Sequence, residues 1–215
     1  MRVVSVNVGV PREVTWKGIP VTTGIFKAPV DGVVTIRRLN LDGDRQADLT
    51  VHGGAHKAVY GYAAEHYEYW RGQLPEISFS WGHFGENLTT EGLFEDSLFI
   101  GDQLQVGSAI LTVTQPRLPC YKITIRFDRD DMIRRFLESR RSGFYFSVVR
   151  EGEVRAGSAI EFLKRDPNHL TVSELNQLYL SRHPDPETLH RALRIEALPR
   201  SWKEDLEFKA AAHHK

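Results

Sequence analysis

The first two-thirds of the 215-residue chain consist of short strand-like runs separated by turns, and this pattern limits the possible folds most. Residues 1–8 alternate apolar and polar side chains, as a half-buried strand does. Many short strands with few helices predict a mainly β fold, a closed or nearly closed barrel, because closure removes exposed sheet edges. Further runs rich in β-branched or aromatic residues lie between turns such as Asp42-Gly43, at 33–39, 98–100, 103–114, 144–150 and 158–163.

Two helices are expected to interrupt the strands. The aromatic-rich segment 62–73 predicts the first, which ends near Leu74-Pro75. The segment 131–141 predicts the second, because it begins with acidic residues, stops before Gly143 and places several apolar residues on one face. Both helices are predicted to lie on the periphery of the barrel.

The chain changes character after Pro167, where three short helices are expected. Thr171 and Glu174 have the spacing of a capping box, and so do Ser201 and Glu204. Asp185 before a proline is typical of a helix start. We therefore predict two parts, a β-barrel over 1–165 and a three-helix appendage over 166–212. The appendage has too few apolar residues to fold alone, so it should pack on the barrel or on a partner.

Charge and hydropathy exclude several classes of protein. The chain has 28 basic and 28 acidic side chains, so it lacks the positive footprint of a general nucleic-acid binder. No apolar run approaches the roughly 18 residues of a membrane span, and the start of the chain lacks a secretory signal pattern. We expect a cytoplasmic protein that binds neither nucleic acid nor membranes.

A single cysteine, Cys120, excludes an intramolecular disulfide and a cysteine-based structural zinc site. A lone cysteine is most often a small buried apolar residue. This one follows Pro116 and Pro119, however, and the cations Arg117 and Lys122 flank it. Nearby cations favour the thiolate. The segment 114–122 thus indicates a nucleophile, a sulfur carrier or a ligand for a soft metal.

Two more polar segments are candidates for ligand binding. In 42–60, Gly53 and Gly54 before Lys57 predict an anion cradle made by backbone N–H groups and a lysine. His52 and His56 are four residues apart, but the glycines between them make a helical metal pair a weak interpretation. In 82–92, polar side chains could bind a phosphate or a heterocycle, although an ordinary solvated loop fits the pattern as well.

Taken together, the three segments resemble the MOSC domain family, named after the C-terminal part of molybdenum cofactor sulfurase, and its YiiM-type branch. The resemblance includes the trailing three-helix appendage, and His56 stands where an acidic residue is expected. The stretches that carry it are TGIFKAPVDG, GDRQADLTVHGGAHKAVYGYAAEHYEYW, FGENLTTEG, IGDQLQVGSAILTVTQPRLPCYK and RAGSAIEF.

The resemblance implies a β-barrel that binds the molybdenum cofactor, with the Cys120 thiolate as the metal ligand. It also implies that cations, hydroxyls and backbone N–H groups hold the cofactor's phosphate, and that Asn87 and Arg45 hydrogen-bond the pterin. A proton donor is required, and His52 and Glu86 are the candidates. The remaining implied cofactor-binding residues are Lys27, Gly53, Gly54, Lys57, Thr89 and Arg117.

The activity implied by the resemblance is the reduction of N-hydroxylated compounds, such as 6-hydroxylaminopurine, to amines. No flavin, haem or nicotinamide fingerprint is visible, so the electrons would come from a separate flavin-type reductase. Two alternatives remain open. The chain could carry the molybdenum cofactor or sulfane sulfur on Cys120 without catalysis, or it could be a thiol hydrolase using Cys120 and His52, although no oxyanion-hole pattern is visible.

Overall fold

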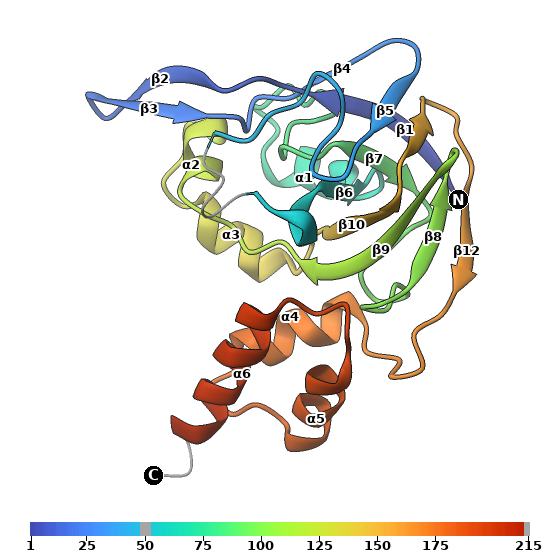
Figure 1. The fold of residues 1–215 in the computed structure, drawn as a ribbon. Helices are drawn as coiled ribbons and strands as arrows, with labels where there is room; N and C mark the ends of the chain where they lie inside the picture. Colours follow the sequence, from blue (N-terminus) through green and yellow to red (C-terminus); the bar gives the residue numbers. More distant parts are fainter. Residues whose placement is uncertain (48–52, 213–215) are drawn as a thin grey trace.

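The computed structural model describes residues 1–47 and 53–212, which form a strongly curled sheet with helices around it (Figure 1). The main sheet has the strand order β12-β8-β9-β10-β6-β7-β1-β4. Its pairs are antiparallel except for β6 and β7, which run parallel. Its strands are β1 (Arg2–Val8), β4 (Ala28–Pro29), β6 (Val59–Ala63), β7 (Leu88–Glu91), β8 (Gln103–Val106), β9 (Ala109–Pro116), β10 (Phe144–Arg150) and β12 (Ile160–Lys164).

Two small ladders and several helices complete the described part of the fold. β2 (Arg12–Trp16) and β3 (Ile19–Thr23) form a hairpin, and β5 (Val34–Ile36) pairs with β11 (Gly152–Val154). The helices are η1 (Ala55–Lys57), α1 (His66–Gln73), α2 (Lys122–Phe127), α3 (Met132–Ser139), α4 (Val172–Leu180), α5 (Pro186–Arg194) and α6 (Arg200–Ala212). No helix of the described residues is long and apolar enough to cross a membrane.

The predicted β-sheet with peripheral helices and a three-helix appendage is present, but the sheet is not a closed barrel. β1 and β12 meet only at a bridge between Arg2 and Ala159. Nearby, the Val3 N–H donates to the Ser158 carbonyl at 2.9 Å. Closure is incomplete because β4 occupies the other end of the same edge of β1, at Asn7 and Val8.

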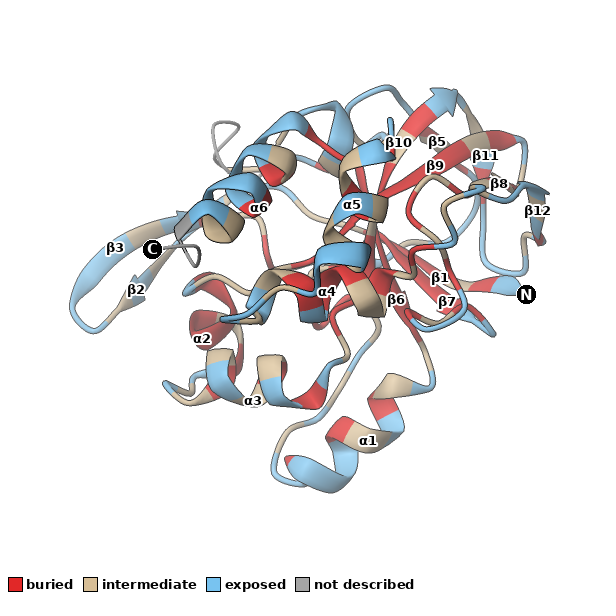
Figure 2. Ribbon diagram, turned by 90° about the horizontal axis from the view of Figure 1, so that it is seen from below, coloured by how far each residue is buried: buried red, intermediate tan, exposed pale blue. Residues whose placement is uncertain are grey.

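Buried residues lie mainly along the strands of the curled sheet and on α2 (Figure 2). Buried hydrophobic side chains form two clusters. The aliphatic core fills the curled sheet, with Leu104, Leu111 and Val113 among its members. The second cluster, here called the aromatic cluster, lies at α1, α2 and α3. It consists of Ile25, Tyr60, Tyr62, Tyr67, Trp70, Leu74, Phe84, Ile123, Phe127, Met132 and Phe136.

The three C-terminal helices pack on the sheet, as the sequence predicts. Their buried residues, such as Leu175 and Trp202, belong to the same aliphatic core as the strands. The capping box of Thr171 and Glu174 and the cap by Asp185 are both present. The second predicted capping box is wrong, since α6 begins at Arg200 and Ser201 therefore lies within its first turn.

Several predicted element boundaries are also wrong. Tyr62 lies on β6 rather than on a helix, because it pairs with Thr89 of the parallel strand β7. The run 103–114 is a hairpin that turns at Gly107, and 98–100 is a turn with a single bridge at Phe99. The β2–β3 hairpin and helix α2 were not predicted. The hairpin does alternate apolar and polar residues on both sides of Lys17-Gly18, and this signal was missed. Helix α2 begins without a side-chain cap, so its sequence carries no start signal.

Candidate functional site

A pocket lies beside Cys120, where loops from both halves of the sheet converge. The pocket and the open solvent at its mouth contain about 650 Å³ of space free of atoms. Of the described residues, five with cationic side chains line it, and none with a carboxylate does. The lining residues are Thr23, Gly24, Ile25, Lys27, Arg45, Gln46, Ala47, Lys57, Tyr60, Gly85, Asn87, Arg117, Leu118, Cys120, Lys122 and Tyr145.

Cys120 is half-buried in the loop between β9 and α2. Its carbonyl accepts a hydrogen bond from the Ile123 N–H at 3.0 Å, which joins the loop to the first turn of α2. Lys57 and Arg117 both interact electrostatically with the thiol. Burial lowers the pKa of Lys57 and Cys120 opposes this effect. The thiol therefore lies between cations from two different segments of the chain.

Lys57 owes its position to η1, which is attached to the end of β9. The Thr114 hydroxyl donates to the His56 carbonyl at 2.7 Å and is also 3.1 Å from the Tyr145 carbonyl. Thr114 thereby connects η1, β9 and β10 next to the pocket. Because η1 has only three residues, it cannot hold Lys57 in place by itself. The predicted position of Lys57 beside an anion site therefore depends on the contact with Thr114.

Arg117 is buried and lines the pocket. Its guanidinium donates to the Phe84 carbonyl and lies 4.9 Å from the centre of the Tyr60 ring. The Phe136 ring is 5.5 Å away on the aromatic cluster. A carbonyl and aromatic faces hold the group in place without neutralising its charge. Arg117 is therefore a fixed positive charge inside the pocket.

Lys27 differs from Arg117 because a carboxylate neutralises it. Its ammonium lies 2.5 Å from a buried oxygen of Asp44. The same carboxylate accepts hydrogen bonds from the Gly9 N–H and the Asn87 amide, both at 2.9 Å. Burial lowers the pKa of Lys27, and Asp44 opposes this shift. Asn87 also accepts from the Tyr60 N–H at 3.1 Å, so its amide mainly orders the pocket wall.

Glu86 lies behind the pocket wall rather than on it. Its buried carboxylate accepts hydrogen bonds from the Tyr67 hydroxyl, the Gly82 and Phe84 N–H groups and the Thr89 hydroxyl. Burial raises the pKa of Glu86, whereas these donors lower it. The carboxylate thus fixes the turn 82–86, in which Gly85 has a positive φ of 80°. This turn also presents the Phe84 carbonyl to Arg117.

The structure brings six of the predicted site residues together on the pocket: Lys27, Arg45, Lys57, Asn87, Arg117 and Cys120. Glu86, Thr89, Gly53 and Gly54 are not among its lining residues. Thr89 is buried and its hydroxyl is used by Glu86 and Asn7. His52 lies outside the described residues. Throughout the described ranges, no group of three or more His, Cys, Asp or Glu side chains is arranged to hold a metal ion.

Sequence reasoning missed Tyr60 and Tyr145 as pocket residues. They lie opposite each other on β6 and β10, with ring centres 5.1 Å apart. Nothing in either local sequence distinguishes them from other strand tyrosines, because their meeting depends on strand register. Lys122, which the sequence also predicts as a cation beside Cys120 in a local basic pocket, does line the pocket.

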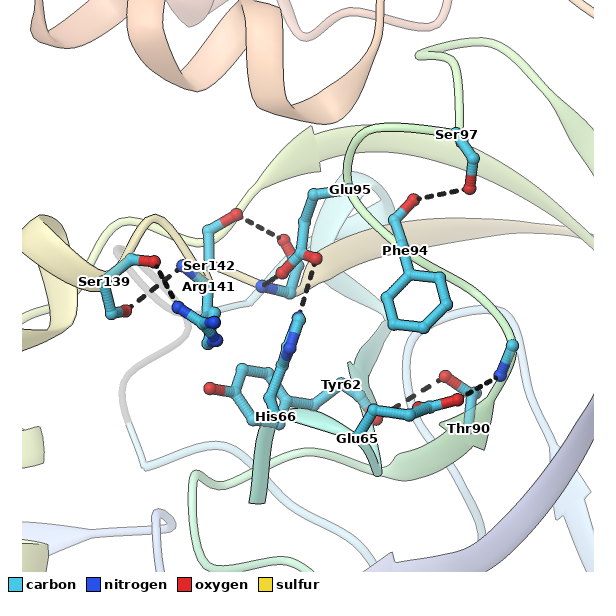
Figure 3. Close-up of polar contacts among 12 residues, drawn as sticks. Tyr62, Glu65, His66, Thr90, Phe94, Glu95, Ser97, Ser139, Arg141 and Ser142 are labelled. Atoms are coloured by element: carbon cyan, nitrogen blue, oxygen red, sulfur yellow. Dashed lines mark hydrogen bonds and ion pairs between the residues drawn. The ribbon is translucent and has the colours of Figure 1, made fainter. Parts of the chain in front are cut away.

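The buried carboxylate of Glu95, which does not line the pocket, supports the turn that precedes β10 (Figure 3). Glu95 lies 2.8 Å from the His66 ring and accepts from the Gly143 N–H at 2.6 Å. The neighbouring Ser142 carbonyl accepts from the Tyr60 hydroxyl at 2.9 Å. These contacts anchor the start of β10, and therefore Tyr60, at the pocket.

The curled sheet, the basic pocket with one thiol and the helical appendage can now be compared with known proteins. Residues 48–161 match the MOSC domain, and residues 170–207 match the "YiiM-like, 3-alpha helix domain". The chain therefore belongs to the MOSC domain family and has the YiiM-like helical extension.

Individual relatives agree with this assignment. The uncharacterized protein YflK of Bacillus subtilis is 38% identical over 94% of this chain and 90% of its own length. Protein YiiM of Escherichia coli is 37% identical over 84% of this chain and 81% of its own length. A protein of Gibberella moniliformis called a reductase is 30% identical over 77% of this chain, but the match covers only 30% of that protein.

The fold is also found in solved structures. The crystal structure of YiiM from Geobacillus stearothermophilus has a TM-score of 0.81 to this chain and is 30% identical to it. The comparison covers 97% of this chain and 98% of the other. The likeness extends over both the curled sheet and the three-helix appendage.

Proposed function

We propose that this chain is an oxidoreductase that binds the molybdenum cofactor through Cys120 and reduces N-hydroxylated compounds to amines. The observation that carries the proposal is a pocket in which five cationic residues and no described carboxylate surround a single thiol. The MOSC family membership and the reductase-named relative from Gibberella moniliformis support it. Electrons would come from a separate flavin-type reductase.

The residues of the pocket fit an anionic cofactor that carries a soft metal. Lys27 is compensated by Asp44, but the buried Arg117 contacts a carbonyl and aromatic rings instead of a carboxylate. Burying uncompensated charge is costly, so a bound anion would stabilise this arrangement. A thiolate is the ligand type that soft metals prefer. Arg117, Lys57 and Arg45 would hold the phosphate and pterin, and Cys120 would hold the metal.

The bound cofactor would supply the two electrons that break the N–O bond. The overall change is R–NHOH plus two electrons and two protons, giving R–NH2 and water. The protein would orient the substrate beside Cys120 and exclude bulk water from one side of the pocket. Lys57 and Arg117 would stabilise negative charge close to the thiolate.

Metal analysis of protein from a host that makes the cofactor tests the binding step. We expect molybdenum and pterin to copurify with the wild type, and Cys120→Ser to reduce molybdenum at least tenfold. Arg117→Gln should lower pterin content, whereas Lys17→Gln, which removes an exposed lysine paired with Asp130, should not. Wild-type protein without molybdenum and pterin, or equal loading in Cys120→Ser, would contradict the proposal.

A turnover assay separates the enzyme from a non-catalytic carrier of cofactor or sulfane sulfur, the second candidate that a lone thiol in a basic pocket supports. A chemically reduced viologen dye would replace the unidentified reductase, and 6-hydroxylaminopurine would be the substrate. We expect the amine product in proportion to bound molybdenum. Loaded protein that forms no amine from N-hydroxylated bases would point to the carrier.

A further inference from the structure

Tyr145 occupies a place on the pocket that neither the sequence analysis nor the family comparison assigns. It lies on β10 and is half-buried, with its side chain among the pocket-lining groups. Its electrostatic neighbours are Arg117 and Cys120. The phenol therefore lies near the thiol that we propose as the metal ligand, where the substrate's N–O group would react.

The hydroxyl groups of the two pocket tyrosines differ in their hydrogen bonding. The Tyr60 hydroxyl donates to the Ser142 carbonyl at 2.9 Å, so its proton is already used by the protein. Within residues 1–47 and 53–212, no protein group is recorded as an acceptor for the Tyr145 hydroxyl. A phenol on a pocket wall without a protein acceptor can donate to whatever occupies the pocket.

The surroundings of Tyr145 keep its proton in place until it is needed. Burial raises the pKa of Tyr145 above its ordinary value of 10, although Arg117 opposes this shift. The group is therefore protonated throughout the neutral range. Tyr145 is nevertheless not fully buried, so solvent in the pocket can return the proton after each turnover.

We propose that Tyr145 is the proton donor to the hydroxyl oxygen of the N-hydroxylated substrate. This inference rests on the proposed function. When the N–O bond is broken by the two electrons that the bound cofactor would supply, the Tyr145 O–H bond breaks and its proton forms water with the departing oxygen. A second proton from solvent completes the amine, and solvent reprotonates the phenolate.

The other candidate acids fit this role less well. Glu86 is held behind the pocket wall by four hydrogen-bond donors and does not line the pocket. Lys57 does line the pocket, and burial lowers the pKa of its ammonium. Its charge, however, is the type of group that binds an anionic cofactor. Removing Lys57 should therefore affect loading, and removing the Tyr145 hydroxyl should affect turnover.

The test uses Tyr145→Phe in the cofactor-loaded protein, with Tyr121→Phe as the matched control. Tyr121 is next to Cys120 in sequence but is 51% exposed and does not line the pocket. We expect Tyr145→Phe to retain its molybdenum and circular dichroism spectrum, while kcat per molybdenum falls about 100-fold, as is typical for loss of a general acid. Tyr121→Phe should stay within twofold of the wild type.

Ligand binding to the oxidised protein provides a readout that does not depend on turnover. Calorimetry should show Tyr145→Phe binding 6-hydroxylaminopurine about fivefold more weakly, which corresponds to one lost hydrogen bond. Binding of the amine product, adenine, should not change. An equal Kd for 6-hydroxylaminopurine in both proteins, together with kcat within threefold of the wild type, would overturn the role of Tyr145.

Two further outcomes separate this inference from the proposed function. If the wild type forms amine and Lys57→Gln, rather than Tyr145→Phe, abolishes turnover per molybdenum, the proton comes from Lys57 and only the present inference fails. If the loaded wild type forms no amine at all, the proposed function fails and the role of Tyr145 fails with it.

Discussion

The aliphatic core and the aromatic cluster are both buried, but they have different roles. The aliphatic core joins the curled sheet to the three C-terminal helices through apolar side chains, and the indole N–H of Trp202 is a polar atom at its edge. The aromatic cluster carries polar groups at the edges of its rings. Trp70 donates to the Tyr62 hydroxyl at 2.7 Å, Tyr67 donates to Glu86, and Tyr60 donates to Ser142. One cluster mainly stabilises the fold, and the other also fixes the polar groups around the pocket.

Leu104→Ala should have the largest effect on stability. Leu104 is fully buried in the aliphatic core, and truncating such a residue costs about 3 kcal/mol because it leaves a cavity. Urea denaturation would measure this loss, and the anion site should be retained at low temperature. A loss below 1 kcal/mol would show that the aliphatic core can rearrange around a cavity. That result would contradict its assignment as the cluster that mainly stabilises the fold.

His83→Gln should change the pH dependence of stability. Burial, with the nearby Arg126, lowers the pKa of His83 to about 3 from an ordinary value of 6.5. Between these values the unfolded chain binds more protons than the folded one, so the wild type loses stability as the pH falls from 6.5 toward 3. The loss should reach about 1.4 kcal/mol per pH unit.

The same urea titrations at pH 7, 6, 5 and 4 would test this prediction. The Gln variant keeps an acceptor for Arg126, which contacts His83 Nδ1 at 3.2 Å, but it cannot titrate. Its stability should therefore vary less with pH than that of the wild type. Parallel profiles for the two proteins would show that His83 does not contribute to acid unfolding.

Tyr67→Phe should destabilise the protein by about 2 kcal/mol with almost no change in volume. It removes one hydrogen-bond donor from the buried carboxylate of Glu86, and an unsatisfied buried group costs about 1–3 kcal/mol. Thermal unfolding would measure the loss, and Tyr121→Phe, at an exposed position, is the control. If both variants have the same thermal midpoint, the Tyr67 hydroxyl at the edge of the aromatic cluster is not important for stability.

Thr171→Ala should have the smallest effect, about 1 kcal/mol, because it removes the side-chain cap of α4. Ser201→Ala is its control, since Ser201 lies inside α6 and caps nothing. The expected difference in thermal midpoint is only a few degrees. An equal effect of both changes would contradict the assignment of the two helix starts.

Local signals in the sequence were sufficient for much of the fold. Alternation predicted β1, and a run of aromatic and β-branched residues predicted β10. The capping residues at Thr171 and Asp185 predicted the starts of α4 and α5. The predictions failed where tertiary pairing overrides local pattern. The aromatic residues before α1 look helical in sequence, yet Tyr62 belongs to a buried strand because β7 pairs with it.

The sequence predicted only those pocket residues whose role can be inferred from the side chains of their own segment. Cys120, Arg117 and Lys57 stand out by residue type, and the structure brings them together. Glu86 and Thr89 also have suitable side chains, but they hydrogen-bond to each other behind the pocket wall and do not line the pocket. Tyr145 reaches the pocket through strand register, which depends on contacts between residues far apart in sequence and cannot be derived from one segment.

One edge of β1 is shared between β4 and a bridge to Ala159, and this arrangement affects the order in which the chain folds. β1 pairs with residues 88–91 on one side and meets Ala159 on the other, so its partners lie far along the sequence. Contacts over such separations are slow to form, because the intervening chain must first be brought into a loop. On the ribosome, β1 must wait until residue 159 has emerged before the curl of the sheet is complete. The strand made first is thus among the last to be fully paired.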